Sequence, residues 1–196
     1  MIKISPKQIK GQWDDGFALD FHTVSSDFVG YDEYGQKCFD TKRTAIGELL
    51  YKLKYGKDQT VVEEIATTAA DFVKSKSWLI DLVTAVPPSS RRQFQPVIVL
   101  AKRLAEVLRI AFCNDCITKT KNTPALKNVF DFQKRKDILD GVFQVNYNKA
   151  KGKNVLLVDD LYRSGATMNE VSSELHSAGK ASKIFALTIT KTSEHR

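Results

Sequence analysis

The sequence predicts an α/β fold in which a mostly parallel sheet is covered by helices on both faces. Short apolar segments recur at 79–86, 110–117, 155–158 and 184–189, which is typical of strands buried on both faces. Between them lie residues with the amphipathic spacing of helices, as in Val97, Leu100, Leu104 and Leu108. Strands that alternate with helices favour a parallel sheet, so we expect one such core.

The composition limits the class of protein. At 196 residues the chain is long enough for one sizeable core, and its net charge of +7 favours anionic partners, whether phosphorylated small molecules or nucleic acid. No apolar run approaches the ~20 residues of a membrane span, and the first residues lack a signal-peptide core, so we expect a soluble, cytoplasmic protein. Of the cysteines Cys38, Cys113 and Cys116, the last two are expected as reduced, partly buried thiols, with metal or redox use as the alternative.

The first 42 residues predict a small β-rich hood or extension, and residues 43–196 predict the α/β core. Residues 17–23 alternate apolar and polar side chains, which indicates a strand with one solvated face. A hairpin follows, with its turn at 32–35 and a return strand at 37–39. His22 falls on the polar side of the alternation, and we expect it to be solvated.

Two helices are predicted before the first buried strand. Asp40 or Thr41 would cap the first, which ends near Gly56, and the Ser75-Lys76-Ser77 sequence interrupts the second. The apolar positions that define the two helices are Ile46, Leu49, Leu50 and Leu53, then Val62, Ile65, Ala66, Ala69, Phe72 and Val73.

The candidate catalytic and binding residues are concentrated where the strand at 155–158 ends. We expect the strand to stop at Asp159 and Asp160, so that both carboxylates leave the ladder and approach one ligand. The small residues at 164–167 would let backbone N–H groups face outward at the start of a helix, which is a phosphate-binding arrangement. A ribose 5-phosphate would suit both parts, with its hydroxyls at the acids and its phosphate at the small residues. The alternative is an ordinary strand-to-helix turn.

The order of apolar strand, paired acids, short bridge and Ser-Gly-Ala-Thr resembles the phosphoribosyl pyrophosphate (PRPP) motif of type I phosphoribosyltransferases. Residues 50–58 and 92–95 also resemble motifs of the ComF-like branch of that family, whose N-terminal zinc ribbon this chain lacks. The chain departs from the family in its bridge, Leu161-Tyr162-Arg163, and at Gln93 and Pro96, where the branch usually has Gly and Gln.

The resemblance implies transfer of the phosphoribosyl group from PRPP to a nitrogen acceptor with release of pyrophosphate. It places Asp159 and Asp160 toward the ribose hydroxyls, and Mg²⁺ would be held mainly by the substrate, without a dedicated protein cage. Arg135 matches the Arg of a ComF-like pattern whose Asn is replaced by Ile138, and it lies in a closing loop expected at 118–136. The implied 5-phosphate site comprises Arg163, Ser164, Gly165, Ala166 and Thr167, and the implied pyrophosphate site comprises Pro88, Ser89, Ser90 and Arg91.

Several alternatives remain open at this point. The loop after residue 86 is also consistent with a Pro-stiffened surface turn, and residues 118–136 with a solvated charged loop. A PRPP-sensing or nucleic-acid-associated protein would keep the same motif without turnover. No residue selects the acceptor base or amine, and nucleic acid and a second copy of the chain remain open as partners.

Overall fold

The computed structural model describes residues 2–88, 94–121, 123 and 132–193. In this part of the chain, a central sheet has the strand order β1-β2-β10-β9-β5-β6, and every neighbouring pair is parallel except β1 and β2. Its strands are β1 (Lys7–Gln8), β2 (Asp15–Phe21), β10 (Lys183–Lys191), β9 (Asn154–Tyr162), β5 (Leu82–Ala85) and β6 (Ala111–Phe112). The predicted fold class is confirmed.

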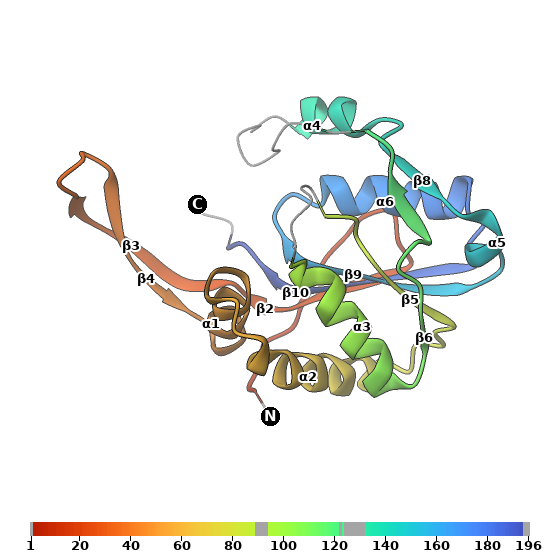
Figure 1. The fold of residues 1–196 in the computed structure, drawn as a ribbon, viewed down its shortest axis with the longest axis horizontal. Helices are drawn as coiled ribbons and strands as arrows, with labels where there is room; N and C mark the ends of the chain where they lie inside the picture. Colours follow the sequence, from red (N-terminus) through yellow and green to blue (C-terminus); the bar gives the residue numbers. More distant parts are fainter. Residues whose placement is uncertain (1, 89–93, 122, 124–131, 194–196) are drawn as a thin grey trace.

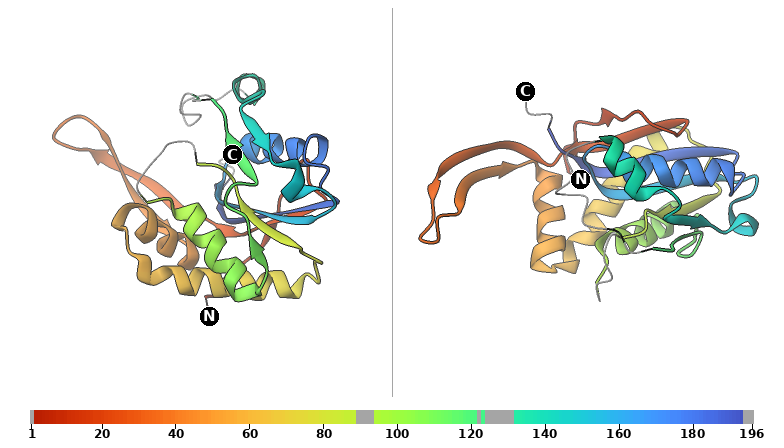
Figure 2. Two further views of the ribbon diagram at one scale, coloured as in Figure 1. Left: turned by 45° about the vertical axis from the view of Figure 1, so that its right-hand side comes forward. Right: turned by 90° about the horizontal axis from the view of Figure 1, so that it is seen from above.

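Helices cover the two faces of this sheet (Figures 1 and 2). One face carries α1 (Ala45–Tyr51), α2 (Val62–Ser75) and α3 (Pro96–Leu108); a π-helical turn, η1 (Lys52–Gly56), and a 3₁₀ turn, η2 (Gln59–Val61), join α1 to α2. The other face carries α6 (Ala166–Ser177), with α5 (Tyr147–Ala150) and α4 (Phe132–Leu139) nearby. A second small sheet pairs β7 (Ile117–Lys119) with β8 (Phe143–Val145) on this side.

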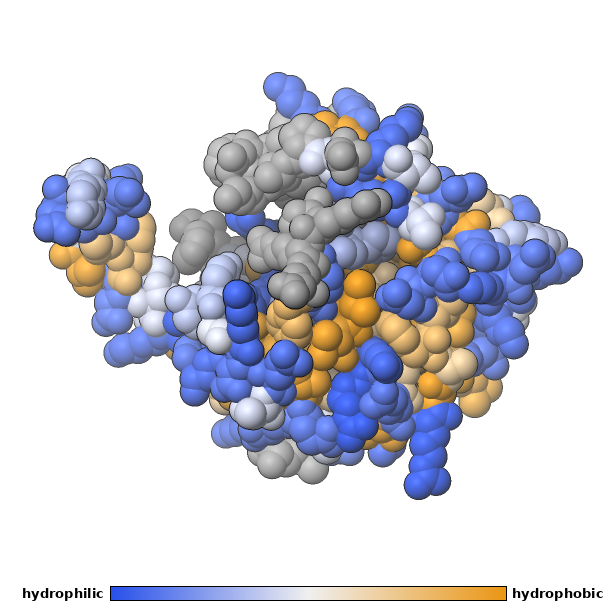
Figure 3. Space-filling view, viewed as in Figure 1, coloured by the Kyte–Doolittle hydropathy of each residue, from blue (hydrophilic) through white to orange (hydrophobic). Residues whose placement is uncertain are grey.

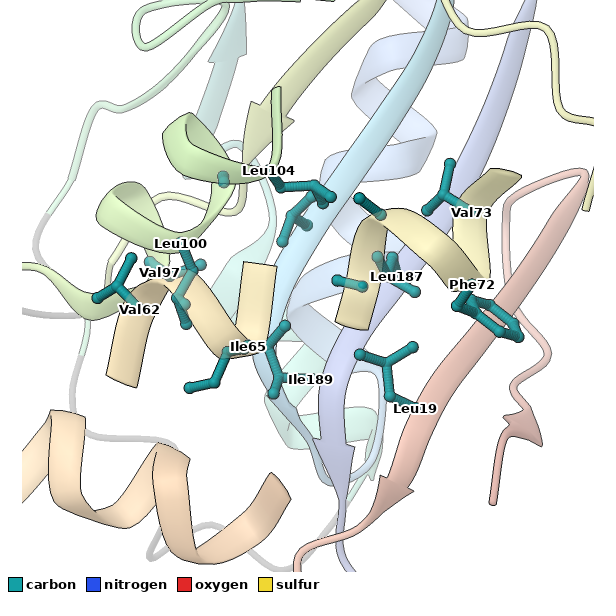
Figure 4. Close-up of a cluster of buried hydrophobic side chains, with 14 of the residues drawn as sticks. Leu19, Val62, Ile65, Phe72, Val73, Val97, Leu100, Leu104, Leu187 and Ile189 are labelled. Atoms are coloured by element: carbon teal, nitrogen blue, oxygen red, sulfur yellow. The ribbon is translucent and has the colours of Figure 1, made fainter. Parts of the chain in front are cut away.

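Two hydrophobic cores follow from the alternation of side chains along β9. Leu156 and Val158 pack with the α1–α3 layer, whereas Val155 and Leu157 pack with the α6 layer, and each is at most 1% exposed. Figure 4 shows the first core, in which Leu100 and Ile65 from the helices face Ile189 from β10. Loss of one such buried leucine costs about 2–5 kcal/mol, so these cores fix the position of β9.

The N-terminal region is divided between the sheet and a projecting hairpin. β1 and β2 belong to the central sheet, where β2 lies parallel to β10. Only β3 (Thr23–Tyr31) and β4 (Lys37–Arg43) leave it, as the predicted hairpin (Figure 1). Asp32 accepts hydrogen bonds from two turn amides, and Gly35 has φ +72°, as the predicted turn requires. The extension expected at 1–42 is thus shared between the core sheet and the hairpin.

Three predicted element boundaries were wrong. The strand expected at 79–86 starts at Leu82, and the strand expected at 110–117 divides into β6 and the start of β7, which belong to different sheets. The first helix is capped by Thr44 and not by Asp40 or Thr41, because β4 continues to Arg43. In each case a tertiary strand pairing overrides the local sequence signal.

Cys113 and Cys116 form a disulfide in the turn between β6 and β7, with their Cα atoms 5.5 Å apart. The prediction of two reduced thiols was therefore wrong. The turn brings the two side chains together because Cys113 hydrogen-bonds to β5 and the carbonyl of Cys116 accepts from Asn146 after β8. In the described part of the chain, no three His, Cys, Asp or Glu side chains are grouped as a metal site would need.

Candidate functional site

Asp159 and Asp160 lie within β9, not after it. The ladder to β10 continues past both acids, through the pairs Leu161 with Thr190 and Tyr162 with Lys191. Successive strand residues point to opposite faces, so the two carboxylates diverge. The expectation that both acids leave the ladder was wrong, because the long β10 continues to supply hydrogen bonds beyond them.

Asp159 has an unusual protonation equilibrium. By alternation from Val155 and Leu157 it lies on the α6 face. Burial, followed by the charge of Asp160, raises its pKa to about 8, although the Asp160 amide donates to its Oδ1 at 2.8 Å. Its register neighbour Thr188 has a buried hydroxyl with no hydrogen-bond partner among the described residues. The α6 face of the sheet therefore carries two neighbouring polar groups, the Thr188 hydroxyl and the Asp159 carboxyl, and the carboxyl resists ionisation.

Asp160 forms an ion pair on the other face of the sheet. Its Oδ1 lies 2.8 Å from Nζ of Lys54 in η1, and both side chains are only about one-fifth exposed. Thr190 also donates to the backbone carbonyl of Asp160 at 3.4 Å. Sequence reasoning missed Lys54 as a site residue, although it lies in the Leu-Lys-Tyr run that resembles the ComF-like motif. That run was the available signal.

The docking of α1 brings Lys54 to the sheet. Thr44 donates from Oγ1 to the carbonyl of Phe21 at 2.6 Å and accepts from the amide of Gly47, which caps the helix and ties it to the end of β2. A Cβ at Gly47 would lie 2.2 Å from the carbonyl oxygen of His22, so only glycine permits this close approach. The following turn then places Lys54 against Asp160.

His22 is half-buried beside this ion pair, so the expectation that it is solvated was wrong. Its Nδ1 lies 3.2 Å from Oγ1 of Thr190. Burial, followed by the positive charges of Lys54 and Arg43, lowers its pKa below the usual value. His22 is therefore neutral at pH 7, with one ring nitrogen that can donate a hydrogen bond and one that can accept.

The predicted phosphate loop, residues 163–167, joins β9 directly to α6. Gly165 is the N-cap of α6 with φ +73°, and this residue provides no side-chain cap to the helix. A Cβ at Gly165 would lie 2.6 Å from Oη of Tyr162, whose ring packs against the loop. Arg163 is exposed, Ser164 and Thr167 are partly exposed, and Ala166 is buried. The helix N-terminus and an exposed guanidinium thus lie next to the acids, which suits an anion.

The segment before β2 also covers the start of α6. The amide of Gln12 donates to Oδ1 of Asn169 at 2.8 Å, and Trp13 meets the Tyr162 ring edge to face, with centroids 6.4 Å apart. Tyr162 also donates weakly to the carbonyl of Lys10, at 3.4 Å. Nothing in the local sequence indicates this packing, because the partners are about 150 residues apart.

The implied pyrophosphate loop is described only at its start. Val86 donates its amide to the carbonyl of Val158 at 2.8 Å, so the chain leaves β5 at the edge where β9 carries its acids. Pro88 follows and is partly exposed. Ser89, Ser90 and Arg91 lie outside the described residues, as do Arg92 and Gln93.

Part of the closing loop expected at 118–136 is regular structure. Residues up to Lys119 belong to β7, and α4 starts at Phe132, so the expectation of one long loop was wrong for both ends. The backbone of Arg135 lies in α4, and its side chain is outside the described residues, as are residues 122 and 124–131. α4 packs near α6, on the Asp159 face of the sheet.

No family model matches the sequence. The chain is 23% identical to the competence protein ComFC of Bacillus subtilis over 154 residues, which is 74% of this chain and 59% of that protein. It is 31% identical to the transcriptional regulator GfcR of Methanococcoides burtonii over 94 residues, which is 48% of this chain and 40% of that protein. The chain thus spans about half the length of these curated relatives. None of the helices in the described part has the length and hydrophobicity to cross a bilayer.

Among solved structures, the fold is similar to that of the glutamine PRPP amidotransferase of B. subtilis. The TM-score is 0.51 at 16% identity, over 81% of this chain and 34% of that one. The chain therefore has the fold of the type I phosphoribosyltransferases and a sequence similar to their ComF-like branch.

Proposed function

We propose that the chain is a phosphoribosyltransferase that binds PRPP with magnesium and transfers the phosphoribosyl group to a nitrogen acceptor, releasing pyrophosphate. One observation carries the proposal most directly. A pair of acids on a central parallel strand is followed, five residues after Asp160, by the N-cap of α6, Gly165, which is in the left-handed conformation and provides no side-chain cap. A ribose 5-phosphate presents hydroxyls and a phosphate on one ligand, so it would suit acids and a helix N-terminus that follow each other in this order.

The two acids would have different tasks, because they lie on opposite faces of β9. Asp159 is next to the α6 loop, and its carboxyl would accept the ribose hydroxyls or face the positive charge that develops at C1 during displacement of pyrophosphate. Asp160 would orient β9 through its ion pair with Lys54. The backbone amides at the start of α6 and the Arg163 side chain would hold the 5-phosphate.

The donor set fits a magnesium ion that is bound mostly through the substrate. Carboxylate oxygens are suitable ligands, and Mg²⁺ in phosphate sites usually takes one or two of them together with phosphate oxygens and waters. Asp159 provides one such group, whereas Asp160 is engaged by Lys54. When bound, the ion would neutralise the adjoining phosphates of PRPP and favour departure of pyrophosphate.

A screen for pyrophosphate release tests the proposal. Purified protein would be incubated with magnesium, PRPP and a panel of purines, pyrimidines and amines. The parent should release pyrophosphate with at least one acceptor, whereas Asp159→Asn/Asp160→Asn should melt normally and lose at least roughly tenfold in PRPP affinity or turnover. The matched control is Glu64→Gln, an exposed acid on α2. A double variant with parental binding and turnover would overturn the role of the acids.

A second candidate is a PRPP-sensing or nucleic-acid-associated protein without turnover. The names of the two curated relatives, a competence protein and a transcriptional regulator, favour it, as does the net charge of +7. In this case PRPP would still protect the fold, but no acceptor would release pyrophosphate, and DNA or RNA would bind at physiological salt. The same screen, with a nucleic-acid binding assay beside it, separates the two candidates.

A further inference from the structure

The hairpin β3–β4, called the arm below, exposes an aromatic face. Phe28 lies directly opposite Phe39 in the antiparallel register, and the rings are 5.8 Å apart between centroids. Tyr31 meets the Phe28 ring edge to face at 5.3 Å. Phe28 and Phe39 are 51% exposed and Tyr31 is 65% exposed, so the cluster is formed but covered by nothing in the described part of the chain. Figure 3 shows hydrophobic surface along one side of the arm, below a hydrophilic tip.

The arm lacks the support that a two-stranded sheet needs. Among the described residues its strands pair only with each other, and neither outer edge has a strand beside it. Its opposite face places Asp27 across from Asp40, and like charges at paired positions are destabilising. An isolated hairpin is marginally stable in water and gains stability from further strands or from packing of its apolar face. Contact of its aromatic face with a partner would therefore stabilise the arm.

The charge of the arm indicates what covers it. The outer part of the arm, residues 26–40, contains four acids and one base, and since the whole chain carries +7, the rest, which includes Lys42 and Arg43 at the base of the arm, carries +10. A negative outer part disfavours a nucleic acid and favours a basic protein surface. Such a surface lies at the root of the arm, where Lys52 and Lys57 are exposed beside Tyr55, which is 69% exposed. The same chain thus carries both the acidic tip and a basic, aromatic surface to receive it.

We propose that the arm is a docking element for a second copy of this chain. The two arms would lie antiparallel with their aromatic faces in contact, and the acidic tip of each, Asp32 and Glu33, would reach the Lys52–Lys57 surface of the other copy. This arrangement is two-fold symmetric and closed. The nine-residue strand β3 spans about 30 Å, which provides the reach.

The exposed area is sufficient for such a contact. At roughly 200 Å² per aromatic side chain, the exposed parts of Phe28, Tyr31, Tyr34 and Phe39 amount to about 500 Å² in each copy. Two copies provide about 1,000 Å² before any backbone or valine is counted, which reaches the lower limit of a specific interface. The proposal does not depend on the phosphoribosyltransferase assignment, because it involves no residue of that site.

Solution mass tests the dimer. Sedimentation equilibrium of the full chain should give twice the monomer mass of 22.0 kDa at micromolar concentration. Phe28→Ser/Phe39→Ser should raise the dissociation constant at least roughly tenfold without changing the circular dichroism, because both side chains are already half exposed. Leu79→Ser is the control, since Leu79 is 79% exposed and far from the arm in sequence. A monomeric parent, or a dimer that the arm variant leaves unchanged, would overturn the proposal.

A charge exchange tests the arrangement itself. Asp32→Lys/Glu33→Lys and Lys52→Glu/Lys57→Glu should each dissociate, because like charges then meet at both ends. An equimolar mixture of these two variants should dimerise again, since each tip now meets an opposite charge on the other chain. If the mixture stays monomeric while the parent is dimeric, the tips do not contact that surface. Binding of the arm to a different protein in preference to a second copy would also overturn the proposal.

Discussion

Asp159 is a single carboxyl whose ionisation opposes folding. An unfolded aspartate titrates near pH 4, whereas the raised pKa of Asp159 is about 8. Between these values the unfolded chain binds fewer protons than the native one, so the free energy of unfolding falls as the pH rises, and it stays reduced above pH 8. A ligand that supplies hydroxyl donors or a cation on the α6 face would offset this cost.

We predict that Asp159→Asn stabilises the protein at alkaline pH and not in acid. The asparagine has the same size but no charge, so at pH 8 the free energy of unfolding should rise by about 1 kcal/mol, a modest gain because the carboxyl is partly exposed. At pH 4 the variant and the parent should agree. Urea unfolding at pH 4, 6 and 8 measures this, and an equal gain at all three values would show that charge is not the cause.

Lys54 affects its neighbour His22 as well as Asp160. Burial is the largest cause of the lowered pKa of His22, and the charge of Lys54 is the next. We predict that Lys54→Met raises the pKa of His22, though it stays below the usual value because the ring remains half-buried. NMR titration of the His22 ring measures the shift, with Lys52→Met, an exposed neighbour, as the control. If the two variants titrate alike, the ion pair does not form in solution.

At the scale of elements, the β9–α6 junction shows what a local pattern predicts. Four apolar residues followed by acids and small residues were sufficient to predict a buried strand, a turn and a helix, and all three are present. The end of the strand was not predictable, because β10 decides it by pairing through Tyr162 and Lys191. The Lys54 ion pair was missed because its partners are 106 residues apart. The run around Lys54 that resembles a ComF-like motif was a signal for the residue but not for its contact with Asp160.

Gly165 supports a prediction about the loop. Gly165 and Gly152 both have positive φ, +73° and +68°, but a Cβ at Gly152 would meet nothing within 4 Å, whereas one at Gly165 would strike Tyr162. Gly152→Ala should therefore cost about 1 kcal/mol from backbone strain alone, and Gly165→Ala at least about twice that. Thermal and urea unfolding measure both. The difference should shrink when Tyr162→Leu is added to each, and a persistent difference would contradict the steric explanation.

At the scale of the whole molecule, the parallel strands of the sheet were predictable, but the division of the chain between the central sheet and the hairpin was less so. Apolar runs identify the parallel strands because these are buried on both faces. The alternation at 17–23 could not show that β2 joins the central sheet, since an alternating strand fits an edge or an appendage equally well. The disulfide between Cys113 and Cys116 was missed because the prediction of reduced thiols rested only on the expected reducing compartment. The geometry of the turn decides whether the two side chains meet.

The proposed ligand should act on the stability of the entire fold. PRPP with magnesium at a hundredfold excess over its dissociation constant should raise the free energy of unfolding by about 2.7 kcal/mol. A melting temperature that stays the same at millimolar PRPP would contradict the assignment of PRPP as the ligand. A polymer binder would instead lose affinity steeply as salt rises, so the salt dependence of any DNA or RNA binding discriminates between the two candidate functions.

The place of β10 in the sheet has a consequence for how the chain folds during synthesis. β10 lies between β2 and β9, so it joins the β1–β2 pair to the β9–β5–β6 group, yet it is the last of these strands to leave the ribosome. Until then the nascent chain has two separate sheets, each with an open apolar edge that is prone to wrong pairing. Completion of the core is therefore a late, long-range step of folding.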